Sequence, residues 1–520
     1  MMSENTQNVK LSRRRVLQLA GATAALPLSQ GLVGCVGAPA EQGKGGGGGG
    51  KLIVCMSESP STLDPAFAID RPEYSVTSWV YDNLVRLDHE LNVKPSLALE
   101  WTSNKQADVW KFRLRKDARF TNGRRVVSDD VAFSLRRLLD KKVASPGRTE
   151  LAVIERVEIP DNETVVLRLI GPYAELPALM ATKWARIVAK EGVKDLKTKP
   201  LGSGPYEFDE YVPQSHVSVR VRDDYWDSEA GRMKEIFQRT IPDNVAQLNA
   251  LESGDVHIVA DVPVEFYDRV NDGEGLRIEQ SSAAQWFPMV MRVDKEPFDD
   301  PLVREALKWC IDRQELIDGP LDGHGVLGND QPVPPSSEYY ADIKPKEQDI
   351  GRAKQLLAKA GLPDGFTHTI VASTDTPLRA DVAVAITQMV KKAGITFKVK
   401  TVDPNTYLNR VYKKGSLYIG QWGQAYPLDS LLTPHFASDA SLNEYRYREK
   451  KLDKALMAAR AAVDDQRRKE LYGDVQSIIG GEGPIVIPFF TRRFSGVRSG
   501  VKGYEASALL NFDLRYVDLR

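Results

Sequence analysis

The sequence predicts a mixed α/β fold with more than one lobe. Its 520 residues exceed the length over which a single hydrophobic core keeps growing. After residue 50, segments with the two-residue period of a strand alternate with segments that have the period of a helix. With 42% hydrophobic residues, 27% charged residues and a formal net charge of −1, the composition is that of an ordinary globular protein and does not indicate nucleic-acid binding.

The first 35 residues predict the export signal of a lipoprotein. Lys10 and the run Arg13–Arg15 precede the segment VLQLAGATAALPLSQGLVG, which is too short and too rich in small residues for a membrane span. SRRRVLQL resembles a twin-arginine export motif, although the Phe and Lys often found in that motif are replaced. LVGC resembles a lipobox, which makes Cys35 the lipidated first residue of the mature chain. The alternative is a stray thiol in a discarded peptide.

Residues 36–50, VGAPAEQGKGGGGGG, predict a flexible tether that spans on the order of 20 Å. The six glycines do not form a phosphate-binding loop, because no Lys-Ser or Lys-Thr follows them. Without residues 1–34, which hold one acid and four bases, the formal charge is −4. We therefore expect an exported protein, periplasmic or in the cell envelope, that a lipid anchors to the membrane.

The first half of the mature chain alternates strand and helix signals. KLIVCMSES, residues 51–59, predicts a strand, and a loop and an amphipathic helix follow it within residues 60–88. VWKFRLRKDARF alternates apolar and basic side chains from Val109 onward, as a strand with one solvated face does. SDDVAFSLRRLLDKK predicts a helix with Ser128 as N-cap, acids in its first turn and bases in its last.

The pattern continues along the rest of the chain. ETVVLRLI and HVSVRVRDDYW alternate as strands do, and PDNVAQLNALESGDVHIV predicts a capped helix that ends at Gly254 before another strand. FDDPLVREALKWCIDRQELI predicts one helix with Asp299 or Asp300 as its N-cap. DIGRAKQLLAKAG predicts another helix, ended by Gly361. After the signal, no apolar run is long enough to cross a bilayer.

The two cysteines beyond the signal, Cys55 and Cys310, predict small core residues. Neither lies in a metal-ligand spacing. A disulfide between them is the less favoured alternative, because we expect the two residues to lie in different lobes.

Catalytic and cofactor motifs are absent from the sequence. It contains no HExxH, GxSxG, Walker loop, CxxC or dinucleotide-binding motif. The six histidines are scattered, and acid pairs such as Asp129–Asp130 and Asp464–Asp465 fit helix caps better than a catalytic pair. We therefore expect no enzyme activity, no cofactor and no protein-bound metal.

Six segments in one order carry a resemblance to a known family. The chain resembles the extracellular solute-binding proteins of family 5, the dipeptide, oligopeptide and nickel receptors of ABC importers. The segments are TLDPA, WKFRLRKDARFTNGRRVVSDDVAFSLRRL, GSGPYEFDEYVPQSHVSVRVRDDYW, LNALESGDVHI, PFDDPLVREALKWCIDRQELI and AKQLLAKAGL.

The resemblance implies a periplasmic-binding-protein-like type II flytrap of two lobes with an extra domain, the three-domain cluster C architecture. Residues 51–86, 201–288 and 487–520 would form lobe 1, with residues 87–200 as the extra domain attached to it, and residues 289–486 would form lobe 2. A ligand that contacts both lobes stabilises the closed state, because only that state makes both sets of contacts.

Two parts of the third segment, GSGPYEFDEYVPQSHVSVRVRDDYW, predict structure rather than ligand binding. GSGPY predicts a turn in which glycine permits tight backbone geometry, with Tyr206 packed below it. Tyr225 and Trp226 predict core or loop packing.

The segment IGQWGQAYPLDSLL matches the part of the family's second lobe that faces the cleft, and Trp422 matches the family's tryptophan there. Peptide-binding members place an Asp three residues later to hold the ligand's α-ammonium group, but this chain has Ala425. The DP that follows in the family is replaced by Leu428 and Asp429, so Asp429 is the remaining candidate anchor for an amine. The replacement favours a solute held by aromatic stacking and neutral hydrogen bonds.

Further candidate contacts come from three places. Gln424 and Tyr426 would supply polar contacts beside Trp422. Trp286 falls where the family's chain crosses between the lobes, so it lines the cleft or belongs to the core. The loop after the first strand is either a ligand loop, in which Glu58 would meet a cationic group, or a solvated loop; its residues are Ser57, Glu58 and Ser59.

The sequence thus predicts a monomeric substrate-binding lipoprotein that captures a small peptide-like or other organic solute and delivers it to the permease subunits of an ABC importer. The first alternative is an extracellular sensor or chaperone with the same flytrap, and the second is an exported hydrolase. Transport of nickel as a chelate is a minor alternative, since the sequence has no His or Cys cluster.

Overall fold

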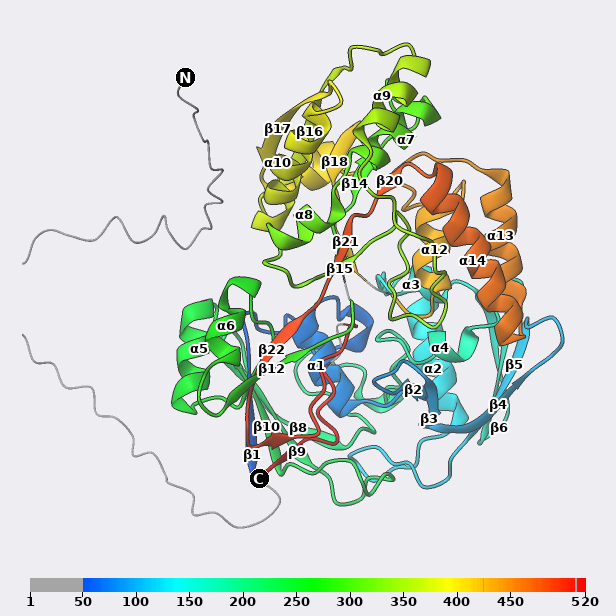
Figure 1. Cartoon of the computed structure of the whole chain (residues 1–520). Helices are drawn as coiled ribbons and strands as arrows, with labels where there is room; N and C mark the ends of the chain where they lie inside the picture. Colours follow the sequence, from blue (N-terminus) through cyan, green and yellow to red (C-terminus); the bar gives the residue numbers. More distant parts are fainter. Residues whose placement is uncertain (1–49, 284, 424, 510–511) are drawn as a thin grey trace, which may run out of the picture. The chain divides into compact units, whose positions relative to one another are not determined.

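The structure, a computed structural model, describes residues 50–283, 285–423, 425–509 and 512–520 (Figure 1). The expected signal with Cys35, most of the tether and Gln424 lie outside the described residues. The described residues belong to one compact unit. Among them, no helix has both the length and the apolarity that a membrane span requires.

A seven-stranded mixed sheet draws on the beginning, middle and end of the chain, in the order β12-β22-β11-β1-β10-β9-β8. Its blue, green and red strands lie in one sheet in Figure 1. The central strand β1 runs parallel to β10 and β11, and the outer pairs are antiparallel. The strands are β1 (Lys51–Met56), β8 (Tyr206–Val212), β9 (His216–Val221), β10 (Glu235–Thr240), β11 (Ile258–Val259), β12 (Leu276–Gln280) and β22 (Phe494–Arg498).

Helices pack against this sheet through two apolar clusters. Helix α1 contributes Val76, Trp79 and Val80 to one cluster, and α5 and α6 contribute Leu248, Leu251 and Val270 to the other. The helices are α1 (Arg71–Val80), α5 (Asn244–Ser253) and α6 (Tyr267–Asn271). As expected, α5 is capped and ends at Gly254, whose φ of 90° suits glycine; the structure assigns the N-cap to Asp243.

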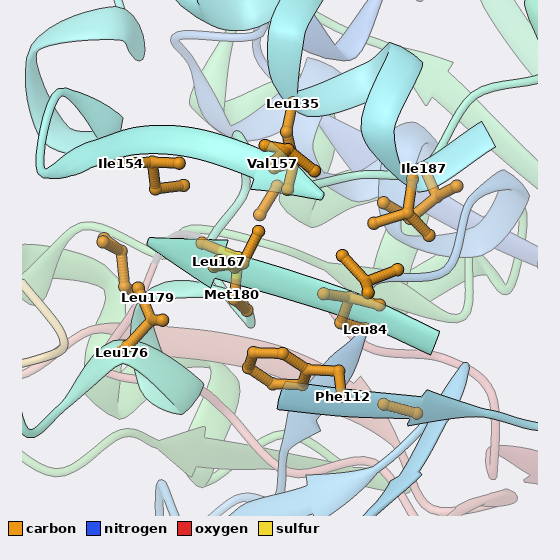
Figure 2. Close-up of a cluster of buried hydrophobic side chains, with 14 of the residues drawn as sticks. Leu84, Phe112, Leu135, Ile154, Val157, Leu167, Leu176, Leu179, Met180 and Ile187 are labelled. Carbon is orange, nitrogen blue, oxygen red and sulfur yellow. The ribbon is translucent and has the colours of Figure 1, made fainter. Parts of the chain in front are cut away.

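A second, antiparallel sheet in the order β4-β5-β7-β6 comes from one continuous stretch of chain. Phe112 of β5, Leu167 of β7 and Leu135 of α2 belong to its core, which Figure 2 shows. The elements of this stretch are β2 (Val85–Leu87), β3 (Val93–Pro95), β4 (Ala98–Ser103), β5 (Val109–Leu114), α2 (Ser128–Leu139), α3 (Arg148–Leu151), β6 (Ile154–Asp161), β7 (Thr164–Leu169) and α4 (Leu176–Leu179).

A third, five-stranded sheet in the order β17-β16-β18-β14-β20 takes its strands from the later half of the chain. The strands are β14 (Met289–Met291), β16 (Thr367–Ser373), β17 (Thr396–Val402), β18 (Leu417–Ile419) and β20 (Ile485–Val486). The helices around it are α7 (Pro301–Cys310), α8 (Arg313–Asp318), α9 (Ile350–Lys359), α10 (Pro377–Lys391), α12 (Asp429–Phe436), α13 (Lys450–Ala461) and α14 (Asp465–Glu482).

The chain passes twice between the seven-stranded and five-stranded sheets, and a small sheet forms at these crossings. Strand β13 (Gln285–Trp286) lies between β12 and β14 in sequence, and β21 (Phe489–Thr491) lies between β20 and β22. The two crossing strands pair with each other, flanked by β15 (Gly325–Leu327) and β19 (Trp422–Gly423), in the order β15-β21-β13-β19. We call this four-stranded sheet the crossing sheet.

Three local predictions were wrong. Ser128 is the first residue of α2 rather than its N-cap: its hydroxyl donates to the Asp161 carbonyl, and the Asp130 carboxylate accepts the backbone N–H of Val127. The single helix expected over residues 298–317 is two helices, because Ile311 is extended and the Asp312 side chain caps α8.

The third concerns α1, which is buried on all sides instead of being amphipathic. Its hydroxyl side chains allow this because they donate to carbonyls of their own helix, as Ser75 does to Arg71 and Ser78 to Ser75.

The cap of α7 was expected at Asp299 or Asp300, and the structure has it at Asp300, which accepts the Leu302 N–H at 2.7 Å.

The glycines of GSGPY bring the chain against the end of α1. A Cβ atom on Gly202 would lie 1.9 Å from the Val80 carbonyl oxygen, and one on Gly204 would lie 2.5 Å from that of Trp79. Tyr206 is fully buried below this turn, as expected. The segment therefore serves backbone packing.

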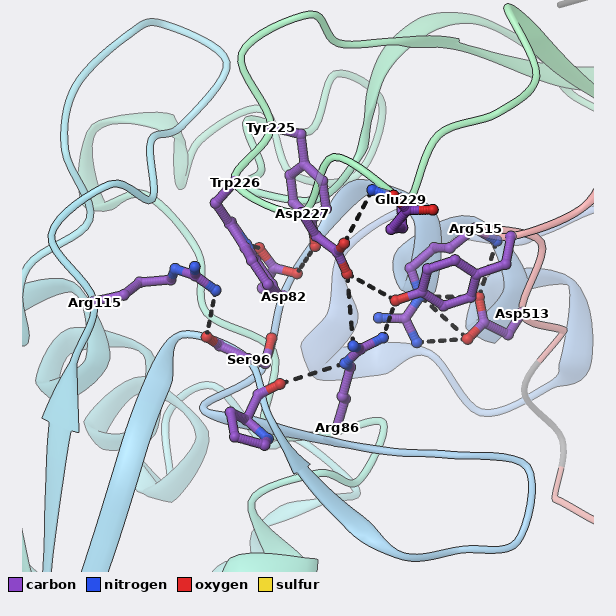
Figure 3. Close-up of polar contacts among 12 residues, drawn as sticks. Asp82, Arg86, Ser96, Arg115, Tyr225, Trp226, Asp227, Glu229, Asp513 and Arg515 are labelled. Atoms are coloured by element: carbon purple, nitrogen blue, oxygen red, sulfur yellow. Dashed lines mark hydrogen bonds and ion pairs between the residues drawn. The ribbon is translucent and has the colours of Figure 1, made fainter. Parts of the chain in front are cut away.

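Tyr225 and Trp226 hold a buried carboxylate, as Figure 3 shows. The Tyr225 hydroxyl donates to Asp82 at 2.9 Å and the Trp226 indole N–H donates to it at 3.3 Å. The Arg115 guanidinium lies 3.5 Å from the Trp226 ring centroid. These contacts join Asp82 and Arg115 to the segment that follows β9.

Cys55 and Cys310 are both free and buried, as expected for core residues. Burial raises the pKa of each thiol to about 12.

Candidate functional site

Trp422 and Trp286, expected from different parts of the chain, lie side by side in the crossing sheet. They are register partners in the antiparallel pairing of β13 with β19. Trp286 is 2% exposed and packs edge to face on Phe490, with ring centroids 5.9 Å apart. Trp422 is only half-buried. Of the two rings, Trp422 is therefore the one that a solute can reach.

The Trp422 indole is held by a buried carboxylate that sequence reasoning missed. Its N–H donates to Glu444 Oε1 at 2.7 Å, and the Tyr418 hydroxyl donates to Glu444 Oε2 at 2.6 Å. Glu444 is 0% exposed, and burial raises the pKa of its carboxyl while the two donors oppose that shift. Because its only donor is occupied, Trp422 offers a ligand its ring rather than a hydrogen bond.

His435 packs against the same indole. The two ring centroids are 3.9 Å apart at an interplanar angle of 82°. Burial lowers the pKa of His435 to about 3, so the imidazole is neutral at physiological pH. The immediate surroundings of the Trp422 ring are thus aromatic, and the carboxyl group of Glu444 lies at its indole N–H.

The residues after Trp422 provide no exposed carboxylate. Gly423 is exposed, and Ala425 and Tyr426 are half-buried. Burial raises the pKa of the Tyr426 hydroxyl, which therefore stays protonated. Leu428 is buried in the apolar cluster of the helices around it.

Asp429, the candidate anchor for an amine, begins α12 and already has partners. Thr433 Oγ1 donates to its Oδ1 at 2.5 Å, and Arg460 Nε lies 3.5 Å from its Oδ2. Asp429 is 4% exposed, and burial raises the pKa of its carboxyl against the effect of Arg460. Its side chain therefore faces the protein interior.

The loop after β1 is held by hydrogen bonds to Gln214 and Glu73. Ser57 and Glu58 are exposed, and Ser59 Oγ accepts the backbone N–H of Gln214 at 3.1 Å. The next residues are fixed by Ser61, whose N–H and hydroxyl both donate to Glu73. The loop is thus anchored at Ser59 and Ser61, and the exposed pair precedes this anchor.

A metal site is not formed by the described residues: no group of three or more His, Cys, Asp or Glu side chains among them is arranged to hold an ion.

A family model provides the decisive comparison. Residues 92–443 match the model of the bacterial extracellular solute-binding proteins, family 5 middle region. The chain belongs to this family. The family assignment and the type II flytrap fold expected from the sequence are thereby confirmed, and family 5 members are extracellular substrate-binding proteins rather than enzymes.

Relatives cover nearly the whole chain. The glutathione-binding protein GsiB of Salmonella paratyphi A is 26% identical over 488 residues, which cover 90% of this chain and 94% of GsiB. The periplasmic binding protein DppA of Helicobacter pylori, solved with the peptide STSA, is 25% identical with a TM-score of 0.75, and the match covers 91% of this chain and 98% of DppA.

A third relative binds a different compound. The binding protein AgaA from A. tumefaciens R10, solved with agropinic acid, is 25% identical with a TM-score of 0.74, and the match covers 91% of this chain and 99% of AgaA. The family 5 chain described here is thus a solute-binding protein of the kind that serves ABC importers.

Proposed function

We propose that this family 5 protein closes two lobes around a small organic solute and delivers it to an ABC importer, without changing it chemically. Lobe 1 comprises residues 51–86, 201–288 and 487–520, with the extra domain at 87–200, and lobe 2 comprises residues 289–486. The observation that supports closure most directly is the pair of chain crossings at β13 and β21, because two adjacent strands are the only backbone links between the seven-stranded and five-stranded sheets among the described residues.

Trp422 is the proposed centre of the ligand site. It is half-buried, it lies in the crossing sheet next to the first crossing strand, and its indole N–H is occupied by Glu444. A ring fixed in this way recognises a ligand by stacking on its face. Gln424, Tyr426, Ser57 and Glu58 remain proposed contacts from the two lobes.

The proposed ligand is an organic solute whose binding does not depend on a carboxylate at position 425. Ala425 removes the carboxylate that holds a peptide's ammonium group in other members, and Asp429 is engaged by Thr433 and Arg460. An amine without a counter-charge is expensive to bury. A peptide with a blocked or solvated amino end, or a non-peptide compound, fits this site better than a peptide with a buried free amino end.

The remaining parts of the proposal concern location and assembly. Cys35 is the proposed lipid anchor, residues 36–50 are the proposed tether, and the protein acts as a monomer in the cell envelope. The order of basic run, apolar segment, lipobox cysteine and glycine-rich segment supports export and anchoring.

Native mass spectrometry of the chain with Cys35→Ala, purified without refolding, tests the proposal. We expect one intact solute to be released on denaturation, and Trp422→Ala to lower its occupancy at least about tenfold. Trp101→Ala, which truncates a half-buried tryptophan of β4, is the matched control and should keep the solute. Recovery of a cleavage product made by the protein would refute the receptor function.

A further inference from the structure

Residues 173–175, which follow β7 in the proposed extra domain, contact the helices of the proposed lobe 2. The Ala174 N–H donates to the Arg460 carbonyl of α13 at 2.8 Å. The Arg460 guanidinium lies 4.8 Å from the centroid of the Tyr173 ring. A backbone hydrogen bond and a cation–π contact therefore join two bodies that the flytrap mechanism requires to separate.

Glu175 is the centre of this contact. Its Oε1 accepts the Leu428 N–H at 3.3 Å, and its Oε2 accepts the Asp429 N–H at 3.4 Å and the hydroxyl of Tyr472 in α14. Glu175 is 6% exposed. A carboxylate from one body thus occupies the N-terminal end of the eight-residue helix α12 of the other, where unpaired N–H groups and the helix dipole favour a negative charge.

Other polar groups also pair with each other across this contact. The Tyr173 hydroxyl bonds to the Asp429 carboxylate, which also lies beside Arg460. Tyr173 and Tyr472 are both buried. The hydrogen bonds of Tyr173 and Tyr472 to these carboxyl groups exist only while the two bodies are together, whereas after separation water must solvate the two hydroxyl groups.

The contact is also continuous with the proposed ligand segment. Leu428 and Asp429 lie six and seven residues after Trp422. A shift of this segment that accompanies ligand binding therefore acts directly on the two N–H groups that Glu175 accepts.

We propose that Glu175 and the N-terminal end of α12 form a latch that holds the lobes together independently of ligand. The inference rests on the lobe division proposed above. A latch of this kind sets how much of the ligand-free protein is closed, and hence the apparent affinity for any solute.

Burial adds a proton dependence to the latch. It raises the pKa of Glu175 to about 7, with the Tyr472 hydrogen bond and Arg468 opposing the shift and Asp429 adding to it. Two other groups that face the carboxyl stay protonated, because burial and the nearby acids raise the pKa values of Tyr173 and Tyr472. Burial raises the pKa of the neighbouring Asp429 carboxyl as well.

Distances between spin labels in the ligand-free protein test the latch. Lys105→Cys in the extra domain and Lys392→Cys in lobe 2 are exposed label sites, whereas the native Cys55 and Cys310 are buried, and Cys35→Ala removes the remaining thiol. Bound solute is removed by partial unfolding and refolding. We expect a closed and an open distance, with the open-to-closed ratio raised about three- to tenfold by Glu175→Ala and less by Tyr472→Phe.

Glu163→Ala is the matched control, because Glu163 pairs with Arg125 and Lys116 inside the extra domain and should leave the ratio unchanged. Unchanged ratios in both latch variants, or a change in the control as large as in Glu175→Ala, would overturn the latch. If Glu175→Ala fails to fold by circular dichroism, Tyr472→Phe decides. Since no solute is present, a failure of solute binding in the earlier experiment leaves this result independent.

Discussion

Two buried glutamates in this protein perform contrasting tasks. Glu444 and Glu175 each accept a hydrogen bond from a tyrosine hydroxyl, at Tyr418 and Tyr472 respectively. The partners of Glu444 lie 22 and 26 residues away in sequence, whereas those of Glu175 lie 253 to 297 residues away. The same chemistry therefore fixes one side chain within a proposed lobe in the first case, and joins the two proposed lobes in the second.

The largest expected difference between the two glutamates is in the free energy of unfolding, and Glu444→Ala tests it. It leaves the Tyr418 hydroxyl and the Trp422 indole N–H without an acceptor inside one lobe, so we expect a loss of about 3 kcal/mol in the free energy of unfolding. Denaturant titration followed by circular dichroism measures this loss. Glu175→Ala should cost much less, because water solvates its partners when the lobes part. Equal losses in the two variants would show that both glutamates act inside a single rigid body.

A pH titration sharpens the comparison next. The pKa of Glu175 is raised to about 7 in the latched state, and we expect it to return to the ordinary value of about 4.5 when the lobes separate. The closed state therefore binds the proton more tightly than the open state. The closed-to-open ratio rises as pH falls from 8 through 7, and it levels off near the ordinary pKa of a glutamate. Between pH 8 and pH 5.5 the closed-to-open ratio of the spin-labelled protein should rise about 30-fold.

The control for this titration is Glu175→Ala, which should remove most of the pH dependence. Asp429 contributes in the same direction, because burial raises its pKa as well. A ratio that falls on acidification would contradict the assigned sign.

The smallest expected effect concerns local protection. In Glu175→Ala, amide hydrogen exchange at Leu428 and Asp429 should accelerate about fivefold, because their N–H groups lose their acceptor. Exchange in β18 should not change. Glu444→Ala should show the reverse pattern, with faster exchange near Tyr418, and a common pattern in both variants would contradict the separation of the two roles.

Local features of this fold were predictable because their causes are local. The alternation after Val109 places Phe112 in a core, and Asp243 and Gly254 mark the ends of α5. The break between α7 and α8 was not predicted, since Asp312 reads as an ordinary helical residue until its side chain caps Glu315.

The candidate site was predictable only in part. Trp422 is visible from its resemblance to the family segment, but the acceptor of its indole N–H comes from Glu444, and the acceptor for the N–H groups of α12 comes from Glu175. An acid in a polar-looking segment carries no periodic signal that it will be buried. Such partners follow from tertiary packing, which brings together groups that the sequence keeps far apart.

The pairing of β13 with β21 restricts how the proposed lobes move. Because the two crossings are hydrogen-bonded neighbours, and the backbones of Ser281 and Arg493 join them again at one end, they twist together and not separately. The simplest relative motion of the proposed lobes is then a bend of this two-stranded ribbon, about an axis that runs across the crossing strands. A solute held beside that axis experiences little displacement on closure, whereas a contact far from it opens and closes over the full arc.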